Sequence, residues 1–328
     1  MNVTAAHPEL LAELQAEVRE HLGPGARVEG LEALLGGSSR ELWGFDVLLG
    51  AERLELVLRR DPPGVEDPAG RAREFAALRA AGAHGVPAPR VHWITADGTG
   101  LVMTRLSGES IPRRLLSHER YATARERLGD DIARAAAATH AVPLSELPEL
   151  HAPEHPPALA AVEALEDQLD RLAQPHPALE LGLRWLRARL PPPRPPALVH
   201  GDLRMGNLMV DEGGLVGLLD WELCHAGDPA EDLGWLCIRS WRFGDDALPA
   251  AGVTTRERLL DAYAAADGVR IGLDELRFWE VCGNARWGVI CVAQADVHLS
   301  GRRASLEHAA IGRRACEAEW DLLDMLGP

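Results

Sequence analysis

The apolar residues of this chain change their spacing within its first half. Three early runs, at residues 28–34, 41–49 and 53–59, have the short pattern of strands and are separated by glycine-rich turns. Later in the chain, the spacing of three to four residues that is typical of helices dominates. We therefore expect an α+β fold with two parts: a small antiparallel-sheet part at residues 1–106, and a larger, mainly helical part at residues 107–328.

The other elements follow from similar patterns. Helices are expected at residues 8–22, 71–81, 122–141, 158–173 and 178–190, and two more strands in the segments PAPRVHWI and TGLVMTRL. A stiff proline-rich connector, PPPRPPA, leads into the segment LVHGDLRMGNLMV. Beyond it, the apolar runs NLMV and LVGLLDW flank the turn residues DEGG, and this pattern predicts a β-hairpin.

The charge of the chain narrows its partners. The 328 residues include 34 basic and 50 acidic side chains, which gives a formal net charge of −16. Nucleic acids and anionic membranes select basic surfaces, so neither is expected as the main partner. All 34 basic residues are arginine. No lysine is therefore available as a Schiff base, a general base or a phosphate ligand. The sequence gives no indication of the oligomeric state.

The cysteines and the N-terminus indicate a compartment. The five cysteines are odd in number and have no C-x-x-C spacing, which fits buried thiols better than disulfides or a zinc site. The N-terminus lacks a signal pattern of basic and then apolar residues, and no apolar run is long enough to span a membrane. We expect a cytoplasmic protein.

The residues that carry chemistry lie in the segment HGDLRMGN, residues 200–207, and in the hairpin that follows it. Phosphoryl transfer needs a carboxylate that orients the attacking hydroxyl and accepts its proton, together with ligands that hold Mg²⁺ on the triphosphate. An H-x-D-x-x-x-x-N loop supplies the carboxylate of Asp202 and the amide of Asn207. The hairpin then returns a second carboxylate, Asp220, to the same place. This pattern predicts a kinase that acts on a substrate hydroxyl.

These motifs resemble those of the aminoglycoside phosphotransferase/choline kinase superfamily, whose fold is related to that of protein kinases. The branch that looks most similar includes the kinase-like domain fused to some acyl-CoA dehydrogenases. The resemblance rests on LVHGDLRMGN, LLDWE and GDPAEDLGWL, with weaker support from GGSS, VLRRDPP and VMTRLSGE. It is dense over residues 198–245 and thin but collinear over 30–140. It implies a bilobal protein-kinase-like fold that uses ATP and Mg²⁺.

The resemblance also implies roles for single residues. Asp202 matches the catalytic base, and Asn207 and Asp220 match the Mg²⁺ ligands. Arg59 stands where the superfamily usually has the lysine that binds the α- and β-phosphates, and Glu74 would be its ion-pair partner. The other nucleotide-binding positions are the turn that covers the phosphates (Gly36, Gly37, Ser38 and Ser39) and the hinge whose backbone pairs with adenine (residues 103–106, with Met103 and Arg105).

Arginine at position 59 is the clearest departure from the family pattern. Its guanidinium binds phosphate as a wide planar fork and not as a point charge. The change therefore affects the geometry of phosphate binding more than activity itself. Arg204 follows Asp202 by two residues, and we hypothesise that it reaches the γ-phosphate and stabilises transition-state charge.

Several nearby polar residues have a structural interpretation. His200 is expected to hold the loop backbone through hydrogen bonds, and Asp232 resembles the aspartate that braces this loop in the superfamily. Asp228 is followed by proline and, at the third helical position, by Glu231, which predicts a helix N-cap. His140 ends a helix and is expected to pack there or to interact with the helix dipole.

Two interpretations compete with catalysis by a kinase. A pseudokinase would keep the same loop and bind nucleotide without turnover. A metal hydrolase would instead use His200, Asp202, Asp220 and His225 as a site of two carboxylates and two histidines. The hydrolase interpretation leaves the whole N-terminal part unexplained.

The acceptor is indicated only by the residues expected around its pocket. The helix that begins in GDPAEDLGWL should present three of them beyond the metal site, and a later helix should present the rest: Arg239, Trp241, Arg242, Asn284, Arg286 and Trp287. Arginine beside tryptophan suits an acceptor with an apolar body and an anionic group, such as a hydroxy acid or its CoA thioester. Aminoglycoside or macrolide phosphorylation is the alternative. The structural alternative is that the tryptophans are core and the arginines pair with Asp245 and Asp246.

Overall fold

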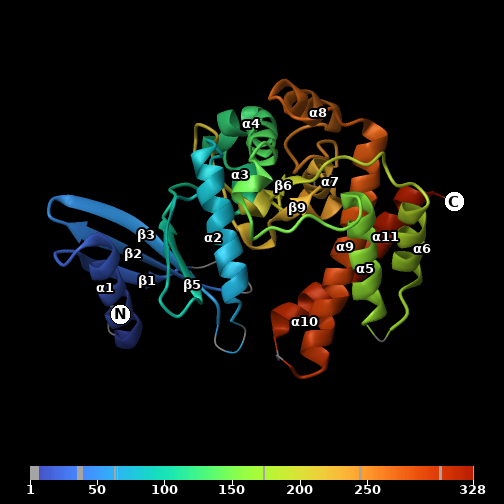
Figure 1. Ribbon diagram of the computed structural model, residues 1–328. Coiled ribbons are helices and arrows are strands. Elements are labelled where there is room, and N and C mark those ends of the chain that lie inside the picture. Colours follow the sequence, from blue (N-terminus) through green and yellow to red (C-terminus); the bar gives the residue numbers. More distant parts are fainter. Residues whose placement is uncertain are drawn as a thin grey trace. The chain divides into compact units, whose positions relative to one another are not determined.

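The structure is a computed structural model that describes residues 7–34, 40–62, 64, 66–172, 174–243, 246–302 and 305–327. The chain divides into two compact units, Met1–Ser107 and Gly108–Pro328 (Figure 1). The sequence placed this division after residue 106. The expected combination of an antiparallel sheet and a mainly helical part is confirmed.

The first unit contains a five-stranded antiparallel sheet with the strand order β1-β2-β3-β5-β4. Its elements are α1 (Pro8–Leu22), β1 (Arg27–Ala33), β2 (Glu41–Leu49), β3 (Glu52–Arg60), α2 (Pro68–Ala83), β4 (Val91–Ile94) and β5 (Gly100–Thr104). The first three strands form the expected meander. The last two form a hairpin in which β5 pairs with β3, so β4 and β1 are the two edge strands.

The two faces of β3 carry different residues. Leu56 and Leu58 join the core that α1 covers with Leu10 and Leu14. Successive side chains of a strand point to opposite faces. Arg59 therefore points away from α1, toward the face where α2 lies against β4 and β5.

The second unit is mainly helical and contains two short strand pairs. Its elements are α3 (Pro112–Ser117), α4 (Ala122–His140), α5 (Pro157–Asp170), α6 (Pro177–Arg187), β6 (Ala197–Val199), β7 (Leu208–Val210), β8 (Leu215–Leu218), β9 (His225–Gly227), α7 (Pro229–Cys237), α8 (Arg256–Ala265), α9 (Leu273–Leu299), α10 (Leu306–Gly312) and α11 (Ala315–Leu326), with short 3₁₀ turns between some of them. The long helix α9 packs against α5, α6, α7, α10 and α11 (Figure 1). Over the described ranges, no helix is both long and apolar enough to cross a membrane.

The two strand pairs bring the segment of residues 200–207 and the segment that contains Asp220 together. The expected hairpin is present as β7 and β8, and β6 pairs with β9, which the sequence did not predict. Between β6 and β7 the chain turns at Gly201, where φ is +76° and a Cβ would lie 2.3 Å from the Leu223 carbonyl oxygen. Only glycine fits there, so the loop that carries Asp202 is closely packed on the segment after β8.

Helices α7 and α9 also approach closely. A Cβ on Gly234 would lie 2.4 Å from the Cβ of Trp279, so the absent side chain lets the two helices come together. The contact buries Trp235 and Trp279, which are 3% and 1% exposed. Both tryptophans help to form the site described next.

Candidate active site

Asp202 lies in the loop after β6 and is 9% exposed. Its carboxylate accepts hydrogen bonds from three side chains. Asn207 Nδ2 donates to Oδ2 at 2.6 Å, and Arg204 Nε lies 3.1 Å from Oδ1 and 3.0 Å from Oδ2. Trp235 Nε1 donates to Oδ1 at 2.9 Å. Donors on both oxygens fix the plane of the carboxylate.

Asn207 and Asp220 are held beside this loop by backbone contacts. The Asn207 carbonyl accepts the amide of Leu219 at 2.8 Å, which places Asp220 directly after the pairing. Asp220 has a left-handed backbone, with φ +64° and ψ +66°, a conformation that is costly for residues other than glycine and often found at functional sites. Since the Asn207 amide nitrogen is bonded to Asp202, its Oδ1 is the atom that remains for a metal. An amide oxygen and a carboxylate are ligands that Mg²⁺ accepts, so the donor set fits this ion.

His200 holds the loop, as expected. Its Nδ1 accepts the amide of Asp202 at 3.2 Å, so the proton must lie on Nε2, which donates to the Leu219 carbonyl at 2.9 Å. Both ring nitrogens are therefore engaged. Across the described part of the chain, no group of three or more His, Cys, Asp or Glu side chains is arranged to bind a metal, and the hydrolase interpretation finds no support.

Asp232, on α7, supports the loop that carries Asp202 through hydrogen bonds to its backbone. Its carboxylate accepts the amides of His200 at 2.7 Å and Gly201 at 2.9 Å, and His140 Nε2 lies 3.1 Å away. Burial alone would raise the pKa of Asp232, but the hydrogen bond and charge of His140 and the contacts of His200 outweigh burial and lower the pKa to about 2. His140 also contacts the Tyr263 hydroxyl through Nδ1 at 2.7 Å. The sequence suggested packing or a dipole contact for His140, and the structure adds these hydrogen bonds.

In the first unit, Arg59 forms the expected ion pair with Glu74. The two side chains are almost fully buried, and Glu74 also pairs with Arg71 from its own helix. The carboxylate of Glu74 is thus shared between two guanidinium groups. The turn expected to cover the phosphates, Gly36, Gly37, Ser38 and Ser39, lies outside the described residues.

The hinge residues Met103 and Arg105 lie at the end of β5. Met103 is paired with Val57 on β3, within the sheet. The amide of Arg105 donates to the Glu55 carbonyl at 2.9 Å, and its guanidinium lies 3.0 Å from Asp46. The Arg105 side chain is therefore engaged with the sheet, and the expected pairing of the hinge backbone with adenine stays a prediction.

The arginines and tryptophans expected around the acceptor separate into two groups. Helix α7 ends at Cys237, and a 3₁₀ turn, Arg239–Trp241, directs Trp241 into a buried cluster with Trp235 and Trp287. Arg239 and Arg242 both pair with Asp246, at 2.8 and 3.5 Å. These contacts match the structural alternative as far as Asp246 is concerned, whereas Asp245 lies outside the described residues. The residues that follow this alternative are Arg239, Trp241, Arg242 and Trp287. A separate polar pocket of about 300 Å³ is lined by Arg239, Arg242 and the buried Asn284.

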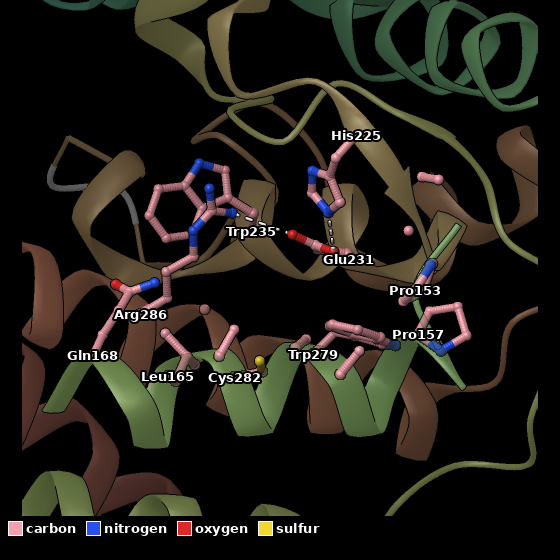
Figure 2. Close-up of a pocket in the computed structure, with 16 residues that line it drawn as sticks. Pro153, Pro157, Leu165, Gln168, His225, Glu231, Trp235, Trp279, Cys282 and Arg286 are labelled. Carbon is pink, nitrogen blue, oxygen red and sulfur yellow. Dashed lines mark hydrogen bonds and ion pairs between the residues drawn. The ribbon is translucent and has the colours of Figure 1, made fainter. Parts of the chain in front are cut away.

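Arg286 belongs to the second group, because it lines a pocket of about 260 Å³ between α5, β9, α7 and α9 (Figure 2). The wall is largely apolar, with Pro153, Pro157, Ala164, Leu165, Trp235, Trp279 and Cys282 among its residues. Its polar part is a network in which Glu231 lies 3.2 Å from both His225 Nε2 and Arg286 Nη1. Burial raises the pKa of Glu231, but His225 and Arg286 lower it further than burial raises it. Glu231 is thus ionised, and His225 and Arg286 already balance its negative charge.

Sequence reasoning missed the pocket and two of its residues. Asp228 caps α7 as predicted, accepting the Ala230 amide at 2.9 Å. Glu231 was interpreted only as the third residue of that helix, although its carboxylate bonds to Arg286 on α9. Trp235 was not singled out at all. The signal for both was present in the motif GDPAEDLGWL, but their partners lie far away in sequence.

Comparison with known proteins gives a family and a fold. The profile of the phosphotransferase enzyme family matches residues 40–279. The chain is 27% identical over 159 residues to acyl-CoA dehydrogenase family member 10 of Mus musculus, and 26% identical over 277 residues to the probable acyl-CoA dehydrogenase IBR3 of Arabidopsis thaliana. These matches cover 44% and 71% of this chain but only 15% and 32% of the two relatives.

Several solved structures have the same fold. A Ralstonia eutropha protein provisionally named as an aminoglycoside phosphotransferase is 22% identical, with a TM-score of 0.73 and 96% and 97% of the two chains covered. Macrolide 2'-phosphotransferase MphH from Brachybacterium faecium is 21% identical, with a TM-score of 0.62 and 92% and 97% covered. Aminoglycoside phosphotransferase APH(4)-Ia, solved with AMP-PNP and hygromycin B, is 18% identical, with a TM-score of 0.57 and 94% and 98% covered. These likenesses confirm the expected kinase-like fold.

Proposed function

Because this chain belongs to the phosphotransferase enzyme family, we propose that it transfers the γ-phosphate of ATP to a hydroxyl group of a small-molecule acceptor. The observation that carries the proposal is the Asp202 carboxylate, held on both oxygens by fixed donors and placed beside Asn207 and Asp220. The AMP-PNP complex of the structurally similar APH(4)-Ia supports ATP as the donor.

In the proposed reaction, Asp202 orients the acceptor hydroxyl and takes its proton as the new bond to the γ-phosphorus forms. The bond between that phosphorus and the β,γ-bridging oxygen breaks, and ADP leaves. Asn207 Oδ1 and Asp220 would hold Mg²⁺, which neutralises phosphate charge when bound. Arg204 is stacked on Trp241, with 5.1 Å from its guanidinium carbon to the ring centroid. From there we propose that its guanidinium supports the transferred phosphate.

Arg59 is proposed to bind the ATP phosphates in place of a lysine. We expect Arg59→Ala to raise the KM for ATP about tenfold or more, because a charge-assisted contact to phosphate is lost. The fold should survive, since Glu74 keeps its second partner, Arg71. The matched control is Arg60→Ala: Arg60 is the next residue on β3 and pairs with Glu41 at 3.0 Å.

Steady-state kinetics with varied ATP, together with thermal unfolding of each variant, would check this expectation. An unchanged KM for ATP in Arg59→Ala would contradict the assignment. Arg59→Lys adds a geometric comparison. A point charge that restored the KM would show that charge matters more here than the planar fork of the guanidinium.

We propose an acceptor with an apolar, acyl-type body, such as a hydroxy acid or a hydroxyacyl-CoA. The pocket of about 260 Å³ shares the wall residue Trp235 with the Asp202 site. The carboxylate in its polar network, Glu231, already pairs with His225 and Arg286, so a polycation would find little compensation for its lost hydration. The curated relatives, which carry acyl-CoA dehydrogenase names, point to the same acceptor class.

Antibiotic phosphorylation is the second candidate, because the fold matches a macrolide phosphotransferase and several aminoglycoside phosphotransferases. Pockets that bury drug-sized ligands usually measure about 300–1,000 Å³. The pocket in this chain, of about 260 Å³, lies just below that range. A whole macrolide would not fit inside it, nor would a whole CoA thioester, of which only the acyl body is expected to enter. A nucleotide-binding pseudokinase is the third candidate and requires that no acceptor be phosphorylated.

Turnover of Mg·ATP against hydroxy acids, hydroxyacyl-CoAs, aminoglycosides and macrolides separates the three candidates. We expect turnover with the first two classes. Turnover restricted to the antibiotics would contradict the acyl-type acceptor. Protection by Mg·ATP against thermal unfolding, without turnover of any acceptor, would identify a pseudokinase.

A pocket variant links the acceptor to the pocket. Ala164→Phe, on α5, should narrow the pocket and raise the KM for the acceptor several-fold with little effect on the KM for ATP. Asp167→Phe on the same helix is the matched control, because residue 167 is exposed and does not line the pocket. Equal effects of the two variants would contradict acceptor binding in this pocket.

A further inference from the structure

Trp235 contacts the proposed base directly although the two residues lie 33 positions apart. Its indole Nε1 donates to Asp202 Oδ1 at 2.9 Å, and its side chain is buried near the end of α7. An indole N–H donates a hydrogen bond but neither accepts one nor titrates in the physiological range. It can therefore fix the orientation of a carboxylate without competing for the proton that the carboxylate receives.

The ring of Trp235 is itself held in place. The guanidinium of Arg286 lies over it, 4.8 Å from the ring centroid, and Arg286 is bonded to Glu231. The ring of Trp241 packs on it with 5.3 Å between centroids. Glu231 is anchored in turn by His225. A continuous series of contacts thus leads from the pocket network through the indole to the base.

The other donors to Asp202 are less suited to this task. Arg204 is 28% exposed, and the proposed reaction assigns its guanidinium to the transferred phosphate. Asn207 holds Oδ2 and contributes a metal ligand. If Arg204 turns toward phosphate, Trp235 remains as the buried donor on Oδ1.

We propose that Trp235 is a positioning residue that holds Asp202 in its reactive orientation and, as a wall of the adjoining pocket, sets the distance between an acceptor in the pocket and the base. This proposal rests on the proposed function, since it takes Asp202 as the base. Its consequence is specific. Loss of the indole N–H of Trp235 lowers kcat, whereas truncation of another side chain that lines the pocket raises the KM for the acceptor.

The test compares Trp235→Phe with Trp235→His. Phenylalanine keeps an aromatic ring in the cluster but removes the N–H, and we expect kcat to fall about tenfold, with the KM for ATP within about twofold of the unmodified protein. Because the smaller ring also changes the pocket wall, the KM for the acceptor should rise about as much as in the Trp279→Phe variant described below, so the fall in kcat is the distinguishing effect. Histidine has a nitrogen at the same position of its five-membered ring, two bonds from the point of attachment. We expect it to recover part of kcat although it is smaller and packs less well.

Two controls separate positioning from packing. Trp279→Phe changes a buried tryptophan of the same pocket whose indole nitrogen has no hydrogen-bond partner among the described residues, so it should raise the KM for the acceptor and leave kcat within about twofold. Trp185→Phe, on α6, lies outside both the pocket and the Asp202 site and should change neither constant.

The proposal is overturned if kcat of Trp235→Phe stays within twofold of the unmodified protein, or if Trp235→His is no more active than Trp235→Phe. These outcomes differ from failure of the proposed function. In that case Asp202→Asn would retain turnover, whatever the behaviour of the Trp235 variants.

Discussion

Asp202→Asn is expected to lower kcat about 10³-fold. A general base contributes roughly 10²–10⁴ in rate, and an amide cannot take up the proton of the attacking hydroxyl. The substitution is nearly isosteric, but the amide NH₂ would face one of the donors that now bind the carboxylate, Arg204 Nε or Asn207 Nδ2. Loss of orientation therefore adds to loss of the base. The release of ADP in the presence of acceptor measures the effect.

The matched control is Asp211→Asn. Asp211 lies at the turn of the β7–β8 hairpin and accepts backbone amides through Oδ1, an acceptor that asparagine retains. We expect kcat within about twofold of the unmodified protein. Mg·ATP should still protect Asp202→Asn against thermal unfolding, because Asn207 and Asp220 are unchanged. Turnover that survives Asp202→Asn at more than a tenth of the original rate would contradict the proposed mechanism.

The sequence predicted the elements that have a strong local pattern. The apolar residues of α1 recur with helical spacing, and its bounds, Pro8–Leu22, agree with the expected residues 8–22. The strands of the first sheet and the β7–β8 hairpin have equally local signals in their turn residues. The three-residue strands β6 and β9 have too few residues for a pattern and exist only because they pair with each other.

The site shows the same division between local and distant information. The motif predicted that His200 and Asp232 support the loop, and the structure contains the hydrogen bonds that this role requires. It did not predict that Trp235 contacts Asp202 or that Glu231 pairs with Arg286. Both contacts depend on how α7 packs on the loop and on α9, which no local pattern encodes.

The residues expected around the acceptor depend on where a helix ends. The sequence predicted that the helix beginning at Asp228 would continue through Arg239 and Trp241 and present them on the acceptor side. The helix ends at Cys237, where the next residue, Ile238, has an extended backbone with ψ of 149°. The following turn directs Trp241 into the core. An earlier helix end therefore changed the direction in which Trp241 points, because side-chain direction follows the local backbone.

Asp232→Ala should be the most destabilising of the substitutions discussed. The carboxylate accepts two buried backbone amides, from His200 and Gly201, and contacts His140. Alanine leaves these donors without a partner in the protein interior, at a cost of about 3 kcal/mol or more in the free energy of unfolding. Asp232→Asn keeps one acceptor oxygen and should lose less. Urea denaturation at neutral pH measures both effects.

The control for this prediction is Asp130→Ala, which removes a carboxylate whose ion pair with Arg258, at 3.0 Å, is largely exposed. Exposed pairs contribute about 0–1 kcal/mol, so the free energy of unfolding should change little. A similar loss in the two variants would mean that Asp232 does not brace the catalytic loop. Since Asp202 lies in that loop, Asp232→Asn should also lower kcat if enough protein remains folded.

The pH dependence of Asp232 gives this prediction a second test. Its pKa in the folded protein is about 2, below the ordinary value of 3.8. A group with a lowered pKa stabilises the folded state fully at pH values above its unfolded pKa and loses that contribution as the pH falls through the folded pKa. The stability difference between the unmodified protein and Asp232→Ala should thus be constant near neutral pH and shrink between about pH 4 and pH 2. A difference that stayed constant down to pH 2 would mean that neutral packing, and not the ionised carboxylate, holds the His200–Asp202 loop.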